Sequence, residues 1–290
     1  MKQPANQNQH KVPQVYLKQF GYKFHEQNKV SVLKLGEKFI RQKSIKKFLA
    51  ETNIYDIESE NPEIERIFEG LNCDIENEYN DIVTDLENDR KLSEKSYAVL
   101  LQLIPNFIAR SDTWRAFVIH ILESDAKENF LKVICAHLAE SFEDLEYKAF
   151  FRKMVDSPVE EIVNRALMFF TDHLLRRIGH YEIVILQAQE GKPWFTSDNP
   201  VVLENRTARL EIMQKESEVY FPINPRYLAY LHFENSDDKV NELRSYETNQ
   251  IYNATDDQNF DIQQKIMRNA HKYVIFEGEF KYTFGNKENE

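Results

Sequence analysis

The spacing of apolar residues changes at Gly179, and this change constrains the fold more than any other feature of the sequence. From about residue 64 to residue 178, apolar residues recur every three or four positions, which is typical of amphipathic helices. Beyond Gly179, short β-branched runs such as Tyr181–Gln187 and Tyr227–Phe233 are separated by turn residues, which indicates antiparallel strands. Because the helical and extended patterns are segregated along the chain, the sequence predicts an α+β protein.

A second extended region lies near the N-terminus. Lys29–Leu35 and Lys38–Ser44 have near-alternating apolar residues on either side of Gly36-Glu37, which predicts a two-stranded hairpin. We expect this hairpin and the C-terminal strands to form one mostly antiparallel sheet, with the central helical region packed on it. The expected single domain covers residues 1–280, divided into a basic N-terminal segment with the hairpin (1–55), a helical region (60–180) and a strand-rich region with short helices (181–280), followed by a disordered tail at 285–290.

The helical region divides into several predicted helices. The first is expected over about residues 64–90, on a strongly acidic background. Ser93 precedes a more apolar stretch, in which Pro105 is expected to kink or restart the helix. Further helices are predicted at about residues 128–155, 159–178, 237–252 and 260–270, with a last strand at 272–276.

Positive charge is concentrated at the N-terminus, although the whole chain is acidic with a formal net charge of −11. Residues 1–50 contain eleven Lys and Arg against two acidic residues, an excess of nine positive charges. A basic segment on an acidic body predicts a phosphate-bearing partner at this face, either a nucleic acid or a nucleotide. The alternative is that these side chains are ordinary solvated surface lysines.

Several classes of protein are disfavoured by what the sequence lacks. No stretch approaches the length and apolarity of a membrane-spanning helix, and the N-terminus has no apolar signal-peptide core, so we expect a cytoplasmic protein without membrane contact. The cysteines Cys73 and Cys135 are far apart and lack a CxxC pattern, which favours a reducing compartment. The glycine-rich phosphate loops, the GxSxG nucleophile elbow and the HExxH zinc motif do not occur.

The first motif that could carry chemistry is Gln9-His10-Lys11, followed by Val12-Pro13. His10 is a candidate general acid or base, because imidazole titrates near neutrality and the backbone near a proline is restricted. Gln9 and Lys11 are candidate substrate-binding residues beside it. The alternative is an ordinary exposed or capping histidine.

The second motif is the polar string within Phe195–Pro200, which lies between two predicted strands. Ser197, Asp198 and Asn199 are candidate catalytic residues, since a hydroxyl, a carboxylate and an amide are presented together. Asp198 could orient His10 or bind a divalent metal ion, the one cofactor that the sequence suggests. The alternative is turn chemistry, because Asp and Asn before proline satisfy their own backbone.

The third motif is Arg110–Arg115 in the core helical region. If the helix breaks within this segment, the Arg110 and Arg115 guanidinium groups could converge on one anion of the substrate. The alternative is an internal ion pair, with Asp112 or with the acidic helix.

Taken in order, these motifs resemble those of the bacterial domain of unknown function 4238 family. The resemblance includes the run from Gln9 to Phe20, the basic hairpin ending near Tyr55, the arginine segment and the string Phe195–Val201. It covers about residues 7–276 and implies a bacterial, cytoplasmic protein. A role near prophage or defence genes is a separate hypothesis, which no residue of the sequence carries. The resemblance also suggests that motifs separated by almost 190 residues meet at one site.

Two functions are compatible with these residues. The first is a hydrolase acting on a phosphodiester or nucleotide, such as a nuclease-type effector in bacterial defence or toxin systems. In it, His10 would lie near Asp198 and act as general acid or base. Arg110, at the back of the pocket, and Arg115 would neutralise transition-state charge, and the basic face of residues 1–50 would hold the polyanion. The second is a non-catalytic binding or regulatory module in which the same motifs form a structural polar network.

Overall fold

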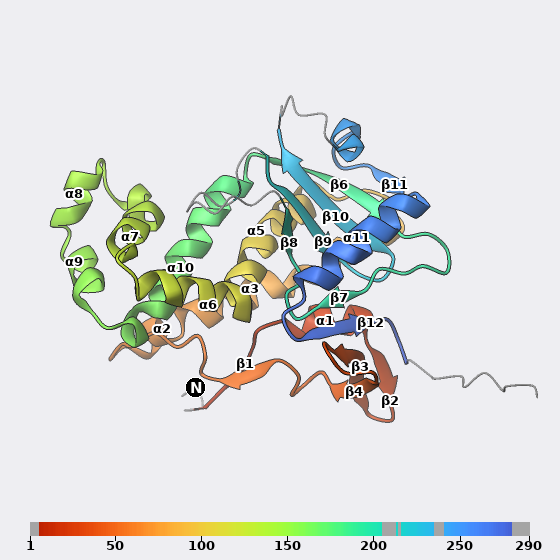
Figure 1. Cartoon of the computed structure of the whole chain (residues 1–290), viewed down its shortest axis with the longest axis horizontal. Coiled ribbons are helices and arrows are strands. Elements are labelled where there is room, and N and C mark those ends of the chain that lie inside the picture. The colour runs from red at the N-terminus through yellow and green to blue at the C-terminus, as the bar shows by residue number, and fades with distance from the viewer. Residues whose placement is uncertain (1–5, 205–212, 214–215, 235–240, 280–290) are drawn as a thin grey trace, which may run out of the picture.

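The computed structural model describes residues 6–204, 213, 216–234 and 241–279, and it has the predicted α+β class (Figure 1). The helices are α1 (Gln14–Phe20), α2 (Pro62–Glu65), α3 (Ile67–Asn77), α4 (Tyr79–Asn88), α5 (Glu94–Arg110), α6 (Asp112–Leu122), α7 (Lys127–Cys135), α8 (Phe142–Tyr147), α9 (Ala149–Asp156), α10 (Val159–Ile178) and α11 (Asp256–Asn269), with 3-10 turns η1 (Ala136–Leu138) and η2 (Glu242–Ser245). The strands are β1 (Asn8–His10), β2 (Tyr22–Phe24), β3 (Gln27–Lys34), β4 (Ile40–Ser44), β5 (Ala50–Thr52), β6 (Tyr181–Gln187), β7 (Thr196–Ser197), β8 (Val202–Glu204), β9 (Glu218–Pro222), β10 (Tyr227–Phe233), β11 (Ile251–Asn253) and β12 (Tyr273–Phe276).

The N-terminal hairpin shares a sheet with C-terminal strands, as predicted. β3 and β4 pair antiparallel on either side of the expected turn, where Gly36 has a φ of 83° that favours glycine. β12 pairs antiparallel with β3 and also with β7, so the order along this hairpin sheet is β2-β3-β12-β7, with β4 added on β3. Figure 1 shows this sheet below the rest of the molecule, with α1 beside it.

The other C-terminal strands form a second sheet, in the order β11-β6-β10-β9-β8, which we call the central sheet. All its neighbours pair antiparallel except β11 and β6, which are parallel. Successive side chains of β6 point to opposite faces: Ile183 and Ile185 join the larger hydrophobic core, whereas Val184 and Leu186 join a smaller core beneath α11. Because both faces are covered, this strand is a continuous apolar run.

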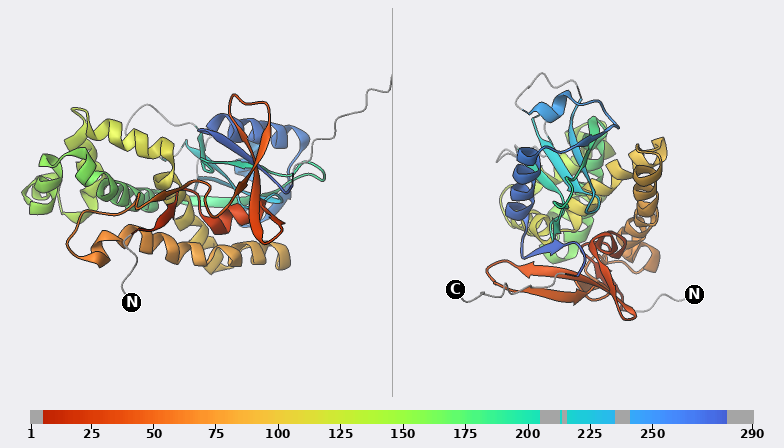
Figure 2. Two further views of the ribbon diagram at one scale, coloured as in Figure 1. Left: turned by 90° about the horizontal axis from the view of Figure 1, so that it is seen from below. Right: turned by 90° about the vertical axis from the view of Figure 1, so that its right-hand side faces the viewer.

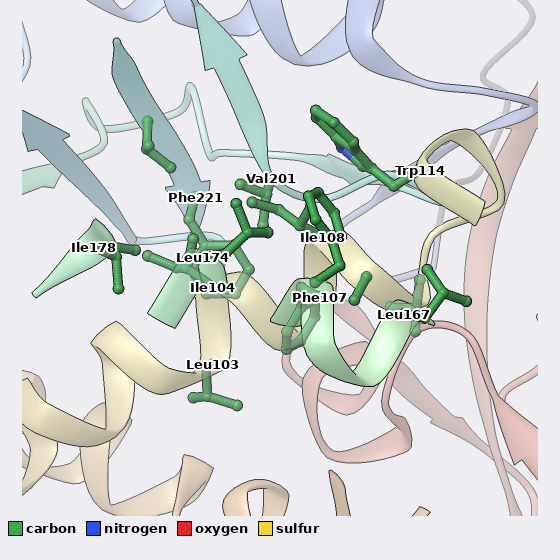
Figure 3. Close-up of a cluster of buried hydrophobic side chains, with 14 of the residues drawn as sticks. Leu103, Ile104, Phe107, Ile108, Trp114, Leu167, Leu174, Ile178, Val201 and Phe221 are labelled. Atoms are coloured by element: carbon green, nitrogen blue, oxygen red, sulfur yellow. The ribbon is translucent and has the colours of Figure 1, made fainter. Parts of the chain in front are cut away.

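The larger core lies where α5 and α10 pack against each other and against the central sheet. Figure 3 shows Ile104 and Phe107 of α5 near Leu174 of α10 and Phe221 of β9. Smaller helices extend the helical region on the side away from the sheets, where α7, α8 and α9 lie (Figure 1). On another side, α4 lies beside α1, as Figure 2 shows from below.

The predictions for Pro105 and for residues 237–252 differ from the structure. α5 runs through Pro105 and ends only at Arg110, since every residue from Leu103 to Arg110 is buried and tertiary packing compensates for the backbone hydrogen bond that proline removes. The expected helix at 237–252 is wrong for the residues described, which contain η2 and then β11. The parallel pairing of β11 with β6 is a tertiary contact, and it overrides the local helical spacing.

The predicted helices at 64–90 and 128–155 are confirmed as helical, but both are divided. The first contains α2, α3 and α4, and the second contains α7, η1, α8 and α9. The expected tail at 285–290 lies outside the described residues. Across the described ranges, no helix combines the length and apolarity that crossing a membrane requires.

Candidate functional site

The three motifs meet in the structure. Tyr16 belongs to the run from Gln9 to Phe20 that begins with the first motif. Its hydroxyl hydrogen-bonds the Thr196 hydroxyl of the second motif, and both groups are buried. The Arg110 guanidinium of the third motif donates to the main-chain carbonyl of His10. The fold therefore brings together segments that are about 100 and 180 residues apart in the chain.

A chain of charged contacts joins the motifs at the start of α6. The Lys11 ammonium lies 2.6 Å from one Asp112 oxygen, and the Lys272 ammonium lies 3.6 Å from the other. The backbone N–H of Lys272 in turn donates to Asp198 at 2.8 Å. Burial opposes the charge on Lys11, but hydrogen bonds to Asp112 and Glu51 outweigh it and raise the pKa of that ammonium.

His10 lies in β1, and its side chain is buried, with 7% of the residue exposed. Burial lowers the pKa of its imidazole, the backbone of Ile45 and Lys46 acts in the opposite direction, and the charge of Arg110 lowers it further. The ring is therefore neutral at pH 7. Its Nε2 atom has no hydrogen-bond partner among the described residues.

Asp198 is buried, and both its carboxylate oxygens are occupied by main-chain donors. Oδ1 accepts from the N–H of His271 at 2.9 Å, and Oδ2 accepts from the N–H of Lys272 at 2.8 Å. Burial raises the pKa of Asp198, and the backbone hydrogen bonds act in the opposite direction. In the part of the chain described, the carboxylate fixes the connection between α11 and β12, and no hydrogen bond joins it to the His10 ring.

Ser197 and Asn199 also bind within their own neighbourhood. The Ser197 hydroxyl donates to the main-chain carbonyl of Asn199 at 2.8 Å and accepts from its N–H at 3.1 Å. The Asn199 amide donates to the carbonyl of Asn269, whose own side chain donates back to the Asn199 carbonyl. These contacts are the turn chemistry that was the alternative interpretation of this string, and they attach it to the end of α11.

The helix does break within the arginine segment, at Ser111 between α5 and α6. The two guanidinium groups nevertheless have separate partners: Arg110 is paired with Glu76 of α3, and Arg115 donates to the side chain of Asn164 at 2.6 Å. Burial opposes the charge of Arg110, but Glu76 outweighs it and raises the pKa, whereas burial lowers the pKa of Arg115. The convergence of Arg110 and Arg115 on one anion is not what the structure shows, because Arg110 is held in an ion pair with the acidic helix.

Gln9 is fully buried and is used to attach β1 to the segment after β5. Its side-chain amide donates to Asp56 at 2.6 Å, and its carbonyl oxygen accepts from the N–H of Tyr55, also at 2.6 Å. The Tyr55 hydroxyl donates to the main-chain carbonyl of Arg110 at 3.1 Å. Gln9 therefore connects the first and third motifs from the inside of the protein.

A cavity of about 520 Å³ opens between the hairpin, the start of α6 and β12. We call it the lysine cavity, because its lining includes Lys11, Lys43, Lys47 and Lys272, with the acids Glu51 and Asp112. Both acids contact Lys11, whereas Lys43 and Lys47 form no ion pair with any residue that the structure describes. The rings of Phe48 and Tyr273, 5.2 Å apart, give the cavity an apolar wall.

The lysine cavity includes residues that the motifs did not single out. The positive excess of residues 1–50 covered Lys43 and Lys47 without distinguishing them from the other basic side chains. Lys272 and Tyr273 gave no local signal, because they reach the hairpin only through the pairing of β12 with β3. Glu76, the partner of Arg110, could not be singled out because the predicted helix at 64–90 contains many acidic residues.

No group of three or more His, Cys, Asp or Glu side chains with the geometry of a metal site occurs in the residues described. Asp198, the candidate metal ligand, offers two oxygens that already accept hydrogen bonds from main-chain N–H groups. The donor set around it does not fit a divalent ion, which prefers several oxygen ligands.

A family model described as a protein of unknown function, DUF4238, matches residues 8–279. Neither the curated proteins nor the solved structures contain a match to the chain.

Proposed function

The chain belongs to the DUF4238 family, and from that starting point we propose that it is a non-catalytic binding module that holds a phosphate-bearing ligand in the lysine cavity. The observation that carries the proposal is a cavity lined by four lysines, in which both acids already contact Lys11. Lys43 and Lys47 are then available for an external anion.

The motif side chains support a structural role for themselves. Asp198 and Ser197 bind main-chain groups, and Arg110 binds Glu76 and the His10 carbonyl. A buried network of this kind fixes one arrangement of the surrounding segments. The motifs thus hold β12 and the hairpin in the positions that bring their lysines to one cavity.

A nucleic acid is the ligand that the charges favour. An ammonium group attracts phosphate as a point charge without selecting a sequence. Three of the four lysines that line the cavity belong to residues 1–50, a segment of the sequence with an excess of nine positive charges. Three phosphate contacts, from Lys43, Lys47 and Lys272, correspond for a single strand to a slope of about −2 in log affinity against log salt. Between 50 and 200 mM salt the affinity should fall by about 15-fold.

The test is fluorescence anisotropy with labelled 20-nucleotide single-stranded RNA and DNA over this salt range. The K43E/K47E variant should bind at least tenfold more weakly than the native chain, with a salt slope nearer −1. The control is K91E/K153E, which makes the same change in net charge at two exposed lysines outside the cavity. An equal loss of affinity for the labelled nucleic acid in both variants would refute the proposal, and so would an affinity of the native chain that does not change with salt.

The phosphodiester hydrolase remains a second candidate because of one observation. The Nε2 atom of His10 is buried without a hydrogen-bond partner among the described residues, on an imidazole whose pKa is lowered. A neutral imidazole can accept a proton in catalysis. If the native chain cleaves RNA, DNA or nucleotides, with or without divalent ions, and H10Q loses this activity at an unchanged melting temperature, the hydrolase replaces the binding module.

We propose that the module lies in the bacterial cytoplasm, as the family resemblance suggests, and that it acts near prophage or defence genes. Cys73 and Cys135 are both free thiols, and this supports a reducing compartment. Fractionation of a bacterial host that expresses the native chain would test the location, with recovery in the membrane or periplasmic fraction as the contrary result.

A further inference from the structure

The turn between β3 and β4 carries an exposed aromatic side chain. Phe39, which immediately precedes β4, is 68% exposed, and its ring forms no aromatic or cation–π contact with a described residue. Leu35, at the other end of the turn, is 40% exposed. Neither side chain belongs to the two hydrophobic cores that the described residues form. The Phe39 ring is therefore accessible to a molecule from outside.

The same turn is basic. Residues 34–43 contain four Lys and Arg against one acidic residue, Glu37. The Glu37 carboxylate is shared between the Lys34 ammonium at 3.5 Å and the Arg41 guanidinium at 3.0 Å, so it neutralises only part of this charge. Both cations are more than half exposed. An exposed ring among solvated cations suits a polyanion that also offers flat, apolar groups, which is the combination that single-stranded nucleic acids present.

The turn continues the lysine cavity along β4. Gln42, Lys43 and Ser44 of this strand line the cavity, and Phe39 lies four residues before Lys43. Four residues span at most about 14 Å, which is about the length of four stacked nucleotides at roughly 3.4 Å each. Arg41 lies between Phe39 and Lys43, on the same face of β4 as Lys43, because side chains two residues apart in a strand point the same way. A strand whose phosphates bind Lys43 therefore reaches the Phe39 ring within a few nucleotides.

We infer that the lysine cavity binds nucleic acid as a single strand, and that an unpaired base of this strand stacks on the Phe39 ring. This specificity rests on the proposed function, because Lys43 and Lys47 must hold the phosphates. Every base has a π-face, so stacking on an aromatic side chain recognises an unpaired base without selecting a sequence. A duplex is stiff and keeps its bases stacked inside, whereas a single strand bends and turns its bases outward.

An anionic membrane is the other surface that a basic turn with apolar side chains could meet. Membrane binding scales with the apolar area that is inserted, and in this turn the exposed apolar side chains are Phe39 and Leu35. The lysines are moreover arranged around a concave cavity, which a flexible strand can enter and a planar bilayer cannot. The turn and the cavity together therefore favour the single strand.

The experiment is fluorescence anisotropy at about 50 mM salt with three labelled probes: a 20-nucleotide single-stranded DNA, the same strand in a duplex, and an abasic strand of the same length. The native chain should bind the single strand more tightly than the duplex and at least about fivefold more tightly than the abasic strand. Phe39→Leu should lose at least about fivefold in affinity for the single strand, since leucine is apolar but has no π-face, whereas Phe39→Trp should bind like the native chain. The salt slope of Phe39→Leu should stay native, because its phosphate contacts remain.

The matched control is Phe260→Leu on α11. Phe260 is 67% exposed, almost as much as Phe39, and it lies outside the lining of the lysine cavity. This variant should bind all three probes like the native chain. The melting temperatures of both leucine variants should be unchanged, because both rings are exposed.

Three results would overturn the inference. The first is native binding of the single strand by Phe39→Leu while K43E/K47E binds weakly, which would leave the proposed function standing without base stacking. The second is equal affinity of the native chain for the single strand and the duplex. The third is a loss of binding to vesicles of phosphatidylcholine and phosphatidylserine in Phe39→Leu, with native binding of the single strand, which would assign the turn to a membrane surface. A loss in Phe39→Leu while K43E/K47E binds like its control supports the stacking on Phe39, even though it refutes the proposed role of the cavity lysines.

Discussion

Replacing Arg110 by Met tests whether this guanidinium supports the fold or serves a ligand. The side chain is 1% exposed, it pairs with Glu76, and it donates to the main-chain carbonyl of His10. Met has a similar length without the charge, so the substitution removes the ion pair while it leaves much of the volume filled. The carboxylate of Glu76, whose side chain is 20% exposed, then remains without its cation.

The expected cost follows from this geometry. Breaking a buried ion pair by removing one partner costs about 3–5 kcal/mol, because the other charge stays buried. Water reaches Glu76 in part, so we expect a loss near the lower end, about 3 kcal/mol in the free energy of unfolding. With a denaturant slope of about 3 kcal/mol per M, the midpoint of urea unfolding should fall by about 1 M.

Urea unfolding followed by tryptophan fluorescence measures this midpoint. The E76Q/R110M double variant should lose less than the sum of the two single variants, because its glutamine leaves no unpaired charge, and the coupling should be about 1–2 kcal/mol. Arg176→Met, on the exposed part of α10, is the control and should change stability by at most about 0.5 kcal/mol. If R110M unfolds at the native midpoint, the guanidinium does not support the fold, and Arg110 returns as a candidate ligand-binding residue.

Three further predictions concern stability. Tyr16→Phe leaves the buried Thr196 hydroxyl without its partner and should lower the free energy of unfolding, measured by chemical denaturation, by about 1–3 kcal/mol. Adding Thr196→Val should recover part of this loss. If the losses of the two single variants simply add in the double variant, the contact is contradicted. Burial acts to raise the pKa of Glu218, but its hydrogen bonds outweigh this and lower the pKa below the ordinary value of 4.5. The resulting stabilisation is present above the unfolded-state pKa and is lost as pH falls through the folded-state pKa. Glu218→Gln should therefore flatten the dependence of melting temperature on pH below about 4.5. Parallel curves of melting temperature against pH for the native chain and the variant would contradict this. Phe107→Ala should lower the free energy of unfolding by about 3–5 kcal/mol and Phe107→Leu by clearly less, because the ring packs edge-on against Tyr16 and Phe221. Equal losses in the two variants on chemical denaturation would contradict this packing.

The α+β class and the hairpin were predictable because their signals are local. Apolar residues in Lys29–Ser44 alternate on either side of a glycine turn, and those of α10 recur every three or four positions. The division of the C-terminal strands between two sheets had no such signal. β7 is only two residues long, and its place beside β12 depends on a pairing across more than 70 residues of chain.

The meeting of the three motifs could be anticipated from the resemblance, whereas the contacts of their side chains could not. His10 and Asp198 are chemically suited to a dyad, but the backbone N–H groups of His271 and Lys272 occupy the carboxylate. Sequence patterns do not reveal such main-chain donors, because every residue except proline has one. The sequence likewise left two roles open for Arg110, an anion-binding residue or an internal ion pair. The structure shows the ion pair, with Glu76 of α3.

The pairing of β12 with β3 also has a consequence for biosynthesis. β3 ends at Lys34, and the strand that completes its sheet begins only at Tyr273, about 240 residues later. At a translation rate of about 5–20 residues per second, the nascent hairpin waits roughly 12–48 s for that strand. During this interval its hydrogen-bonding edge is open to other chains on the same polysome, so a folding factor that shields the emerging N-terminus would raise the yield of native protein.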